Sequence, residues 1–399
     1  SLKASESSLW SGLWSQSADA SVEVLKDKTL RYGEGGLELG VHAMEIKGSG
    51  SLELTAADSS LVLGNTQSHL KLTGNGSVPQ VVVKATHAGG RGLSITGQPS
   101  LAGLEFQVDS SLSATQQFSV DGGILISGVK LTLNDSGTFA NSLVLDGGTL
   151  EVTGQLMLSG VVSQQAASKI KLAQSANLTT QQAVDLGSSV LSLEGPGTFT
   201  NGQPFVLDQS GAGLELRDSV EVAGAVKLGG GVLRSSGDSK VSGALSLSSD
   251  ASVEIASQKT LTYSGPEVSI GQNTLTMEGG GKLLNSSDLV LDDGQSDLTL
   301  DGIGQISSVR VDADSAEGRG IELKKSAEIT TLELNKGVDL SILENAELTG
   351  KVKLNSESSF TPSGAGNLSS DIDMAGGLLK VADTRSLPGT LSLSASSEV

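Results

Sequence analysis

The residues of this sequence that are best suited to chemistry lie in one acidic run, VDADSAEGRGIELKK at 311–325. Asp312 and Asp314 are two residues apart and would face the same side of an extended strand, and Glu317 follows them. Carboxylates in such an arrangement are ligands for Ca²⁺, and a pair of them can act as general acid and base. Asp312, Asp314 and Glu317 are therefore candidates for a Ca²⁺ site or for polysaccharide cleavage.

An earlier part of the chain repeats this run without its acidic residues. The run aligns without gaps with positions 83–97, where Lys84 and Thr86 stand in place of Asp312 and Asp314. Only the Gly-Arg-Gly recurs, at 90–92 in the earlier copy, and a tight corner explains it. We therefore predict a solvated loop with no catalytic residue, and Ca²⁺ is the only cofactor that we consider for it.

A second acidic patch lies in LVLDDGQSDLTLDG, with Asp292, Asp293 and Asp297. It lacks the repeated glycine and aspartate pattern of Ca²⁺-binding β-rolls. We predict a charged face with weak affinity for ions.

The three histidines of the chain, His42, His69 and His87, are dispersed in the sequence. In the later copy, Asn273 stands at the position of His42 and Ser315 at that of His87. A histidine that served as a metal ligand or catalyst in the repeat would be expected in both copies. The sequence thus predicts neither a metal triad nor a catalytic histidine.

Both tryptophans, Trp10 and Trp14, lie in the N-terminal segment 1–18. Trp14 aligns with Leu245 of the later copy, which belongs to an alternating apolar run. Terminal repeats of solenoids are atypical caps, so we expect this segment to cover the first coil. The alternative is an aromatic docking surface, with Trp10 and Trp14 as the residues that contact a partner or the next subunit.

These residues must be positioned by short strands. From Ser21 onward, apolar and polar residues alternate over three to five positions, with Gly, Ser, Asn and Asp between the runs. Strand centres mostly lie seven to eleven residues apart, so three strands make a coil of about 20–27 residues. We predict an all-β parallel β-helix of about 15–18 coils with essentially no helix. A β-sandwich array is the alternative.

The chain also contains a large internal duplication. Residues 19–52 align without gaps with 250–283, and 13 of the 34 positions are identical. Tyr32 and Tyr263 share one repeat position, which predicts packing at a corner, with a stacked ligand as the alternative. The duplication divides the chain into a Trp-containing cap or docking segment (1–18), a first solenoid copy (19–162), intervening coils (163–242) and a second copy (243–399).

We expect the second copy to stop in the middle of a repeat. Residues 391–399 align with 245–253, where the earlier copy continues into another strand. The chain would then be part of a longer array, or a subunit whose open end is covered.

The composition of the chain also argues against several classes of function. The net charge of −19 argues against nucleic acid, because phosphate binding requires clustered Lys and Arg. No apolar run reaches the roughly 18 residues of a membrane helix, so we expect no membrane insertion. The absence of Cys excludes a disulfide framework and thiolate metal sites.

The pattern of GxGxF or GxGxL followed by LxLxGGxLxV resembles the Gly/Ser/Thr-rich repeats of bacterial surface β-helix proteins. Autotransporter passengers and filamentous-haemagglutinin-like adhesins are the groups that it resembles. No NPNGI-type secretion motif, RGD or autotransporter barrel accompanies the repeats. The resemblance implies an extracellular or cell-surface location and a structural or adhesive role.

We therefore predict a non-enzymatic, extracellular β-helical protein that is structural or adhesive. One alternative is a filament or surface-layer subunit that self-associates end to end by strand addition. The other alternative is a β-helix protein that binds or cleaves polysaccharide. The predicted partners are a second copy of the chain or a ligand on a host or matrix surface.

Overall fold

The computed structural model describes residues 1–33, 35–56, 59–87, 91–114, 118–133, 137–139, 142–381 and 389–394. Gly90, the first residue of the predicted Gly-Arg-Gly corner, and residues 395–399 of the predicted repeat end lie outside these ranges. The described chain has 54% strand and no helix, and parallel strands stack into a β-solenoid of about 18 turns. The predicted fold class is confirmed.

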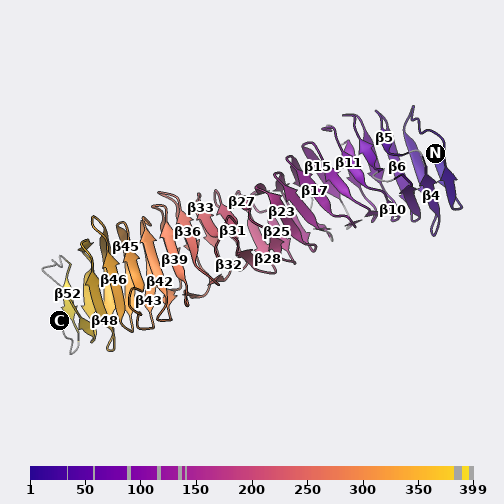
Figure 1. The fold of residues 1–399 in the computed structure, drawn as a ribbon. Coiled ribbons are helices and arrows are strands. Elements are labelled where there is room, and N and C mark those ends of the chain that lie inside the picture. The colour runs from indigo at the N-terminus through magenta and orange to yellow at the C-terminus, as the bar shows by residue number, and fades with distance from the viewer. Residues whose placement is uncertain are drawn as a thin grey trace. The chain divides into compact units, whose positions relative to one another are not determined.

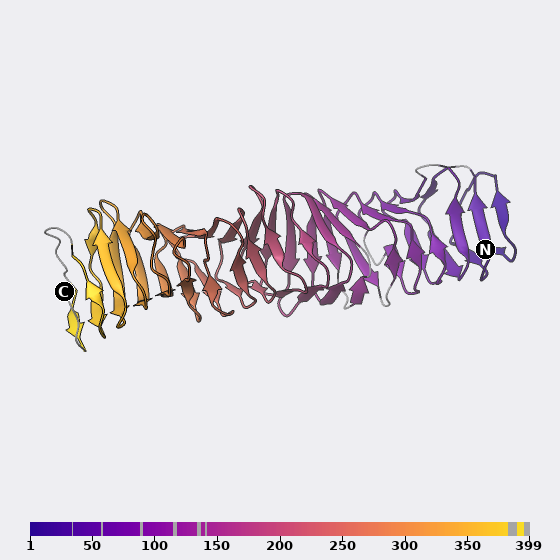
Figure 2. The same cartoon turned by 60° about the horizontal axis from the view of Figure 1, so that its bottom comes forward.

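The chain forms two compact units. Unit 1 comprises 1–191 and 195–203, and unit 2 comprises 192–194 and 204–399. Strand β27 (Val190–Glu194) contains the change from one unit to the other. Within each unit, the strands of successive coils lie side by side in both views (Figures 1 and 2).

Unit 1 has three sheet faces. Face 1 consists of β1 (Leu2–Ala4), β3 (Ala20–Val24), β6 (Ala43–Gly48), β9 (His69–Leu72), β12 (Gly92–Ile95), β15 (Ser110–Ala114), β18 (Lys130–Leu133), β21 (Thr149–Val152) and β24 (Ser168–Leu172). Face 2 consists of β2 (Ser8–Trp10), β4 (Thr29–Tyr32), β7 (Ser51–Leu54), β10 (Ser77–Val78), β13 (Ser100–Leu101), β16 (Ser119–Val120), β19 (Gly137–Phe139), β22 (Gln155–Leu158), β25 (Asn177–Thr180) and β28 (Thr198–Asn201). Face 3 consists of β5 (Leu37–Leu39), β8 (Leu61–Leu63), β11 (Val81–Val83), β14 (Leu104–Phe106), β17 (Ile124–Ser127), β20 (Leu143–Asp146), β23 (Val162–Ala166) and β26 (Val184–Asp185).

Unit 2 repeats these faces. Face 1 consists of β30 (Gly213–Leu216), β33 (Val232–Ser235), β36 (Ala251–Ile255), β39 (Thr274–Glu278), β42 (Asp297–Asp301), β44 (Gly320–Leu323), β46 (Val338–Ile342), β48 (Ser359–Ser363) and β51 (Leu378–Leu379). Face 2 consists of β31 (Glu221–Val222), β34 (Ser239–Val241), β37 (Thr260–Tyr263), β40 (Lys282–Asn285) and β49 (Asn367–Leu368). Face 3 consists of β29 (Phe205–Leu207), β32 (Val226–Leu228), β35 (Leu245–Leu247), β38 (Val268–Ser269), β41 (Leu289–Leu291), β50 (Asp371–Met374) and β52 (Leu391–Leu393). Three longer strands span faces 2 and 3, namely β43 (Gln305–Val311), β45 (Ala327–Leu334) and β47 (Glu347–Leu354).

The pairing register sets the coil length. Leu131 pairs with Leu150 of the next coil, whereas Met44 pairs with Leu70, so the coil that starts at Met44 is the longer of the two. Coil length therefore varies, and the corners absorb the difference because the paired strands stay in register.

The core is a stack of aliphatic side chains. In β21, Leu150 and Val152 are fully buried while Thr149 and Glu151 face outward. Leu150 lies between Leu131 and Ile170 of the neighbouring coils. Burying one such side chain contributes about 1.5–3 kcal/mol, so alternation along each strand provides the stability of each coil.

Acidic side chains at the corners join successive coils. Asp19 accepts a hydrogen bond from the backbone N–H of Ala43, at 2.8 Å. Its counterpart in the second copy, Asp250, accepts one from the N–H of Thr274, at 2.7 Å. The separation in sequence is the same for both pairs, so the two copies use the same bond to hold adjacent coils together.

The copies differ in length at one corner. Six residues separate β7, which ends at Leu54, from β8, which begins at Leu61. In the second copy, only three separate β40, which ends at Asn285, from β41, which begins at Leu289. This difference explains why the two copies align with one offset before the corner and with a smaller offset after it.

The close approach of neighbouring coils yields a prediction for Gly279. This residue has a φ of 99°, and a Cβ atom there would lie 2.3 Å from the carbonyl oxygen of Ile255. We expect Gly279→Ala to lower the free energy of unfolding by about 2–4 kcal/mol, from left-handed strain plus overpacking. Urea unfolding followed by circular dichroism measures the change.

Gly318→Ala is the matched control. Gly318 also has a positive φ, of 76°, but apart from its chain neighbours no atom of the described residues lies within 4 Å of its Cβ position. We expect a cost of about 1–2 kcal/mol, from backbone strain alone. Equal unfolding midpoints for the two variants would contradict the close contact at Gly279.

Candidate functional site

The structure uses the carboxylates of the acidic run to join coils. Asp312 accepts hydrogen bonds from Arg310 Nε, at 2.9 Å, and from Asn335 Nδ2, at 2.7 Å. Asp314 instead accepts one from the backbone N–H of Gly337, at 2.7 Å. Glu317 is exposed. No cluster of three or more His, Asp or Glu residues suited to a metal occurs in the described ranges, and Ca²⁺ binding by this run stays a prediction.

The second acidic patch is also part of the coil framework. Asp292 accepts a hydrogen bond from the N–H of Gly271, at 3.0 Å. Asp293 accepts one from the N–H of Gln295, at 2.9 Å, in an Asx turn. Asn65 makes the same turn in the first copy, with the N–H of Gln67 at 2.9 Å. Asn65 is uncharged and makes the turn that Asp293 makes in the second copy, so the turn requires neither a carboxylate nor a bound cation.

Asp297 is half-buried and differs from Asp312 in the direction of its pKa shift. Burial raises its pKa, which Arg319 partly offsets. The two side chains lie 3.8 Å apart, from Arg319 Nη1 to Asp297 Oδ2.

A charged network on face 3 of unit 2 was missed by sequence reasoning. Arg310 binds Glu267 through two hydrogen bonds, Nη1–Oε1 at 2.7 Å and Nη2–Oε2 at 3.0 Å. It also binds Asp288 and Asp312. One guanidinium therefore joins carboxylates from neighbouring coils, and Glu267 and Asp312 raise its pKa.

The network continues along the next coils. Asn335, the partner of Asp312, accepts a hydrogen bond from Asn355 Nδ2 at 2.6 Å. Glu333 Oε1 accepts from Asn355 at 2.8 Å and from Lys353 at 3.0 Å. These two donors lower the pKa of Glu333. Burial alone would raise the pKa of Asp312, but the bonds from Asn335 and Arg310 outweigh it and lower the pKa.

The same row of outward-facing positions is largely aliphatic in unit 1. Strand pairing places five residues in this row, namely Val62, Val82, Glu105, Leu125 and Val144. Their equivalents in unit 2 are Val290, Arg310, Glu333, Lys353 and Asp373. The signal was present in the sequence, because Arg310 aligns with a valine, but it required comparison of the two copies.

The tryptophans pack as a cluster with Tyr32. The ring centroids of Trp10 and Trp14 lie 5.2 Å apart, and Trp10 meets the edge of Tyr32 at 5.9 Å. Trp10 ends β2, which pairs with β4. Around them, Leu9 and Leu13 expose 66% and 85% of their surface. This packing is compatible with the cap interpretation, and a partner contact stays a prediction.

Tyr32 and Tyr263 occupy equivalent, buried sites. The Tyr32 hydroxyl accepts a hydrogen bond from the N–H of Trp14, and the Tyr263 hydroxyl accepts one from the N–H of Leu245, both at 3.2 Å. Beside Tyr263, the core of unit 2 contains a small apolar space lined by Val241 and Leu245. The residues aligned with these two are Trp10 and Trp14, so the first copy carries much bulkier side chains there.

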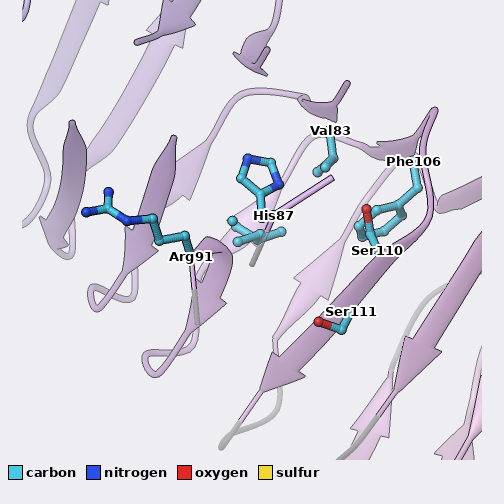
Figure 3. A pocket seen from close by; sticks show the side chains of 8 residues that line it. Val83, His87, Arg91, Phe106, Ser110 and Ser111 are labelled. Carbon is cyan, nitrogen blue, oxygen red and sulfur yellow. The ribbon is translucent and has the colours of Figure 1, made fainter. Parts of the chain in front are cut away.

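A small pocket in unit 1 lies beside His87, Arg91 and Phe106 (Figure 3). The pocket has room for little more than a water molecule, far less than a typical small-molecule site. Ser110 and Ser111 supply hydroxyls at its other side. The buried Nε2 atom of His87 has no hydrogen-bond partner among the described residues.

The histidines are closer together than their spacing in the sequence suggested. His69 interacts electrostatically with His87, and His42 Nδ1 lies 4.0 Å from Asp19 Oδ1. Burial lowers the pKa of both His69 and His87. Both shifts disfavour the protonated imidazole.

No protein-family model, curated protein or solved structure matches the chain. The part of the chain that the structure describes contains no helix with the length and apolar character needed to cross a bilayer.

The Arg310 network yields a pH-dependent prediction. We expect Arg310→Val, which installs the residue of the first copy, to lower the unfolding free energy by about 1–2 kcal/mol at pH 7, because Asp288 and Asp312 lose a charge-assisted hydrogen bond. The lowered pKa of Asp312 means that this stability is present above the ordinary aspartate pKa of about 3.9 and is lost as the pH falls through the folded value. Urea unfolding between pH 8 and 2 measures both effects.

Arg234→Val is the control in the same unit. Arg234 pairs with one carboxylate, Glu254, and both side chains are more than 40% exposed. We expect a loss below about 0.5 kcal/mol. A penalty for Arg310→Val that persisted unchanged at pH 2 would contradict the electrostatic origin.

Proposed function

We propose that the chain is a non-catalytic structural and adhesive solenoid, exposed on the surface of a bacterium. The supporting observation is the use of its polar side chains. Catalysis or metal binding would require carboxylates that are not already held by structural partners. Hydrogen bonds from another coil are instead accepted by Asp312, Asp314 and Asp292. Side chains that hold coils together favour a load-bearing role over catalysis.

The outer row of face 3 supports an adhesive role for unit 1. Val62, Leu125 and Val144 are partly exposed there, and Val82 between them is buried, whereas the equivalent positions of unit 2 include an internally paired charged network. Exposed apolar surface is typical of contact sites. We assign adhesion to this row in unit 1 and a structural role to unit 2.

Binding to wells coated with a basement-membrane extract tests this function. We expect saturable binding of the purified chain above that of albumin-coated wells. The double variant Leu125→Lys and Val144→Asp, which installs the residues of the second copy, is expected to lose most of the binding because the apolar row becomes charged. Circular dichroism checks that the variant is folded.

Met157→Lys is the control, because Met157 is an exposed apolar residue on face 2 of the same unit. It is expected to bind normally. Absence of binding by the unmodified chain, or equal loss in both variants, would refute adhesion through face 3. Release of reducing ends from polygalacturonate that disappears in Asp312→Asn would refute the non-catalytic role.

Self-assembly is a second candidate function, favoured by the exposed Leu9 and Leu13 beside the tryptophan cluster. If this apolar surface joins copies, negative-stain microscopy at rising concentration should show fibres. We expect Trp10→Ser with Trp14→Ser, and separately Leu9→Ser with Leu13→Ser, to abolish them. The leucine pair leaves the packing of the aromatic rings in place and so separates assembly from folding.

Leu284→Ser removes an exposed leucine of unit 2, 40% of whose surface is exposed, and should leave fibres intact. A chain that stays monomeric at every concentration would refute the assembly hypothesis.

A further inference from the structure

All three histidines of the chain lie in neighbouring coils of unit 1, just before or at the start of face 1 strands. His42 directly precedes β6, His69 begins β9, and His87 lies five residues before β12. The pairing register places Ala43, His69 and Gly92 in one row across these strands.

Gly92 brings the second imidazole into this row. A Cβ atom at Gly92 would lie 3.1–3.3 Å from atoms Cγ, Cβ and Nδ1 of His87. The His87 side chain thus takes the place that a side chain at position 92 would occupy. Because neighbouring strands lie about 4.8 Å apart, His87 and His69 are adjacent on the outer surface of the sheet.

Both imidazoles present an unused nitrogen. The Nε2 atoms of His69 and His87 are buried and have no hydrogen-bond partner among the described residues. In a neutral imidazole one ring nitrogen carries the proton and the other carries the lone pair. The tautomer with its proton on Nδ1 has the lone pair on Nε2, which is the arrangement of histidines that bind metals.

Two cationic side chains, Lys71 and Arg91, and one carboxylate, Asp19, interact electrostatically with His69. Arg91 donates hydrogen bonds from Nη1 to the carbonyl oxygens of Gln67, at 2.7 Å, and Val41, at 3.4 Å. Its guanidinium extends away from the His87 ring (Figure 3). Burial is the largest cause that lowers the pKa of His69. Lys71 and Arg91 lower it further, and Asp19 raises it. These two cations disfavour the protonated imidazole, and the negative charge of Asp19 offsets part of their repulsion of a bound cation.

The second copy keeps the framework of this corner but not the ligands. Asp297 stands at the position of His69 and Ser315 at that of His87, and Ser315 Oγ lies 3.0 Å from the Cβ position of Gly320. Asp297 is paired with Arg319. The framework therefore does not require histidines, and their presence in the first copy needs another explanation.

We propose that His69 and His87 bind one divalent transition metal ion, of which Zn²⁺ is the model, through their two Nε2 atoms. Imidazole nitrogen suits Zn²⁺, Cu²⁺ and Ni²⁺, and Zn–N bonds are about 2.0–2.1 Å long. Water, or a donor from a bound partner, completes the coordination. The site is distinct from the acidic runs and from the apolar row of face 3.

Calorimetric titration of the metal-free full-length chain with Zn²⁺ at pH 7.4 tests the site. We expect one ion per chain, with at least tenfold weaker binding in His69→Asn and in His87→Ser. His42→Asn, which installs the residue of the second copy at the third histidine, should bind within twofold of the unmodified chain. Binding should also weaken below pH 6.5, because protons compete for the same nitrogens.

Nuclear magnetic resonance of the unmodified chain with ¹⁵N-labelled histidine provides a readout that does not depend on variants. The chain has three histidines, so three ring systems are observed. Zn²⁺ should shift the Nε2 signals of His69 and His87 and spare those of His42. No binding, equal binding by all variants, or a shift at His42 alone would overturn the proposal.

Discussion

The structure depends on one interaction, the parallel backbone hydrogen bonding of each strand to its equivalents in the adjacent coils. This pairing fixes the register of every strand with its neighbours. Only the outward-facing side chains and the lengths of the corners are free to vary. Leu150 therefore contacts Leu131 and Ile170, although each belongs to a different coil. An aliphatic row inside follows from the need to stack like shapes at about 4.8 Å, and the acidic corners follow from backbone N–H groups that leave the ladder there.

On the outside, the same pairing turns distant residues into neighbours. Arg310 reaches Glu267 and Asp288 because three successive coils place them side by side. His69 and His87 come together because Gly92 leaves room for the second ring. The two copies of the repeat thus share one framework. Their outward-facing side chains differ, and on face 3 they are largely aliphatic in the first copy and largely charged in the second. Any specific chemistry depends on these differences between the copies.

The fold could be predicted because its signals are local. Alternation over a few residues and turn residues between the runs indicated a parallel solenoid, and the parallel pairing of Leu131 with Leu150 agrees with it. The side-chain partners could not be predicted in the same way. Asp312 was compared with its sequence neighbours, Asp314 and Glu317, whereas its partner Asn335 lies one coil later. Because coil length varies, no fixed spacing identifies such a partner.

The corner between β7 and β8 has six residues, and its counterpart between β40 and β41 has three. Three residues were gained or lost there while the flanking strands kept their places in the ladder. The length of such a corner can therefore change independently of the core. Natural variation can lengthen it, and a peptide epitope could be grafted into it, without a compensating change elsewhere in the coil.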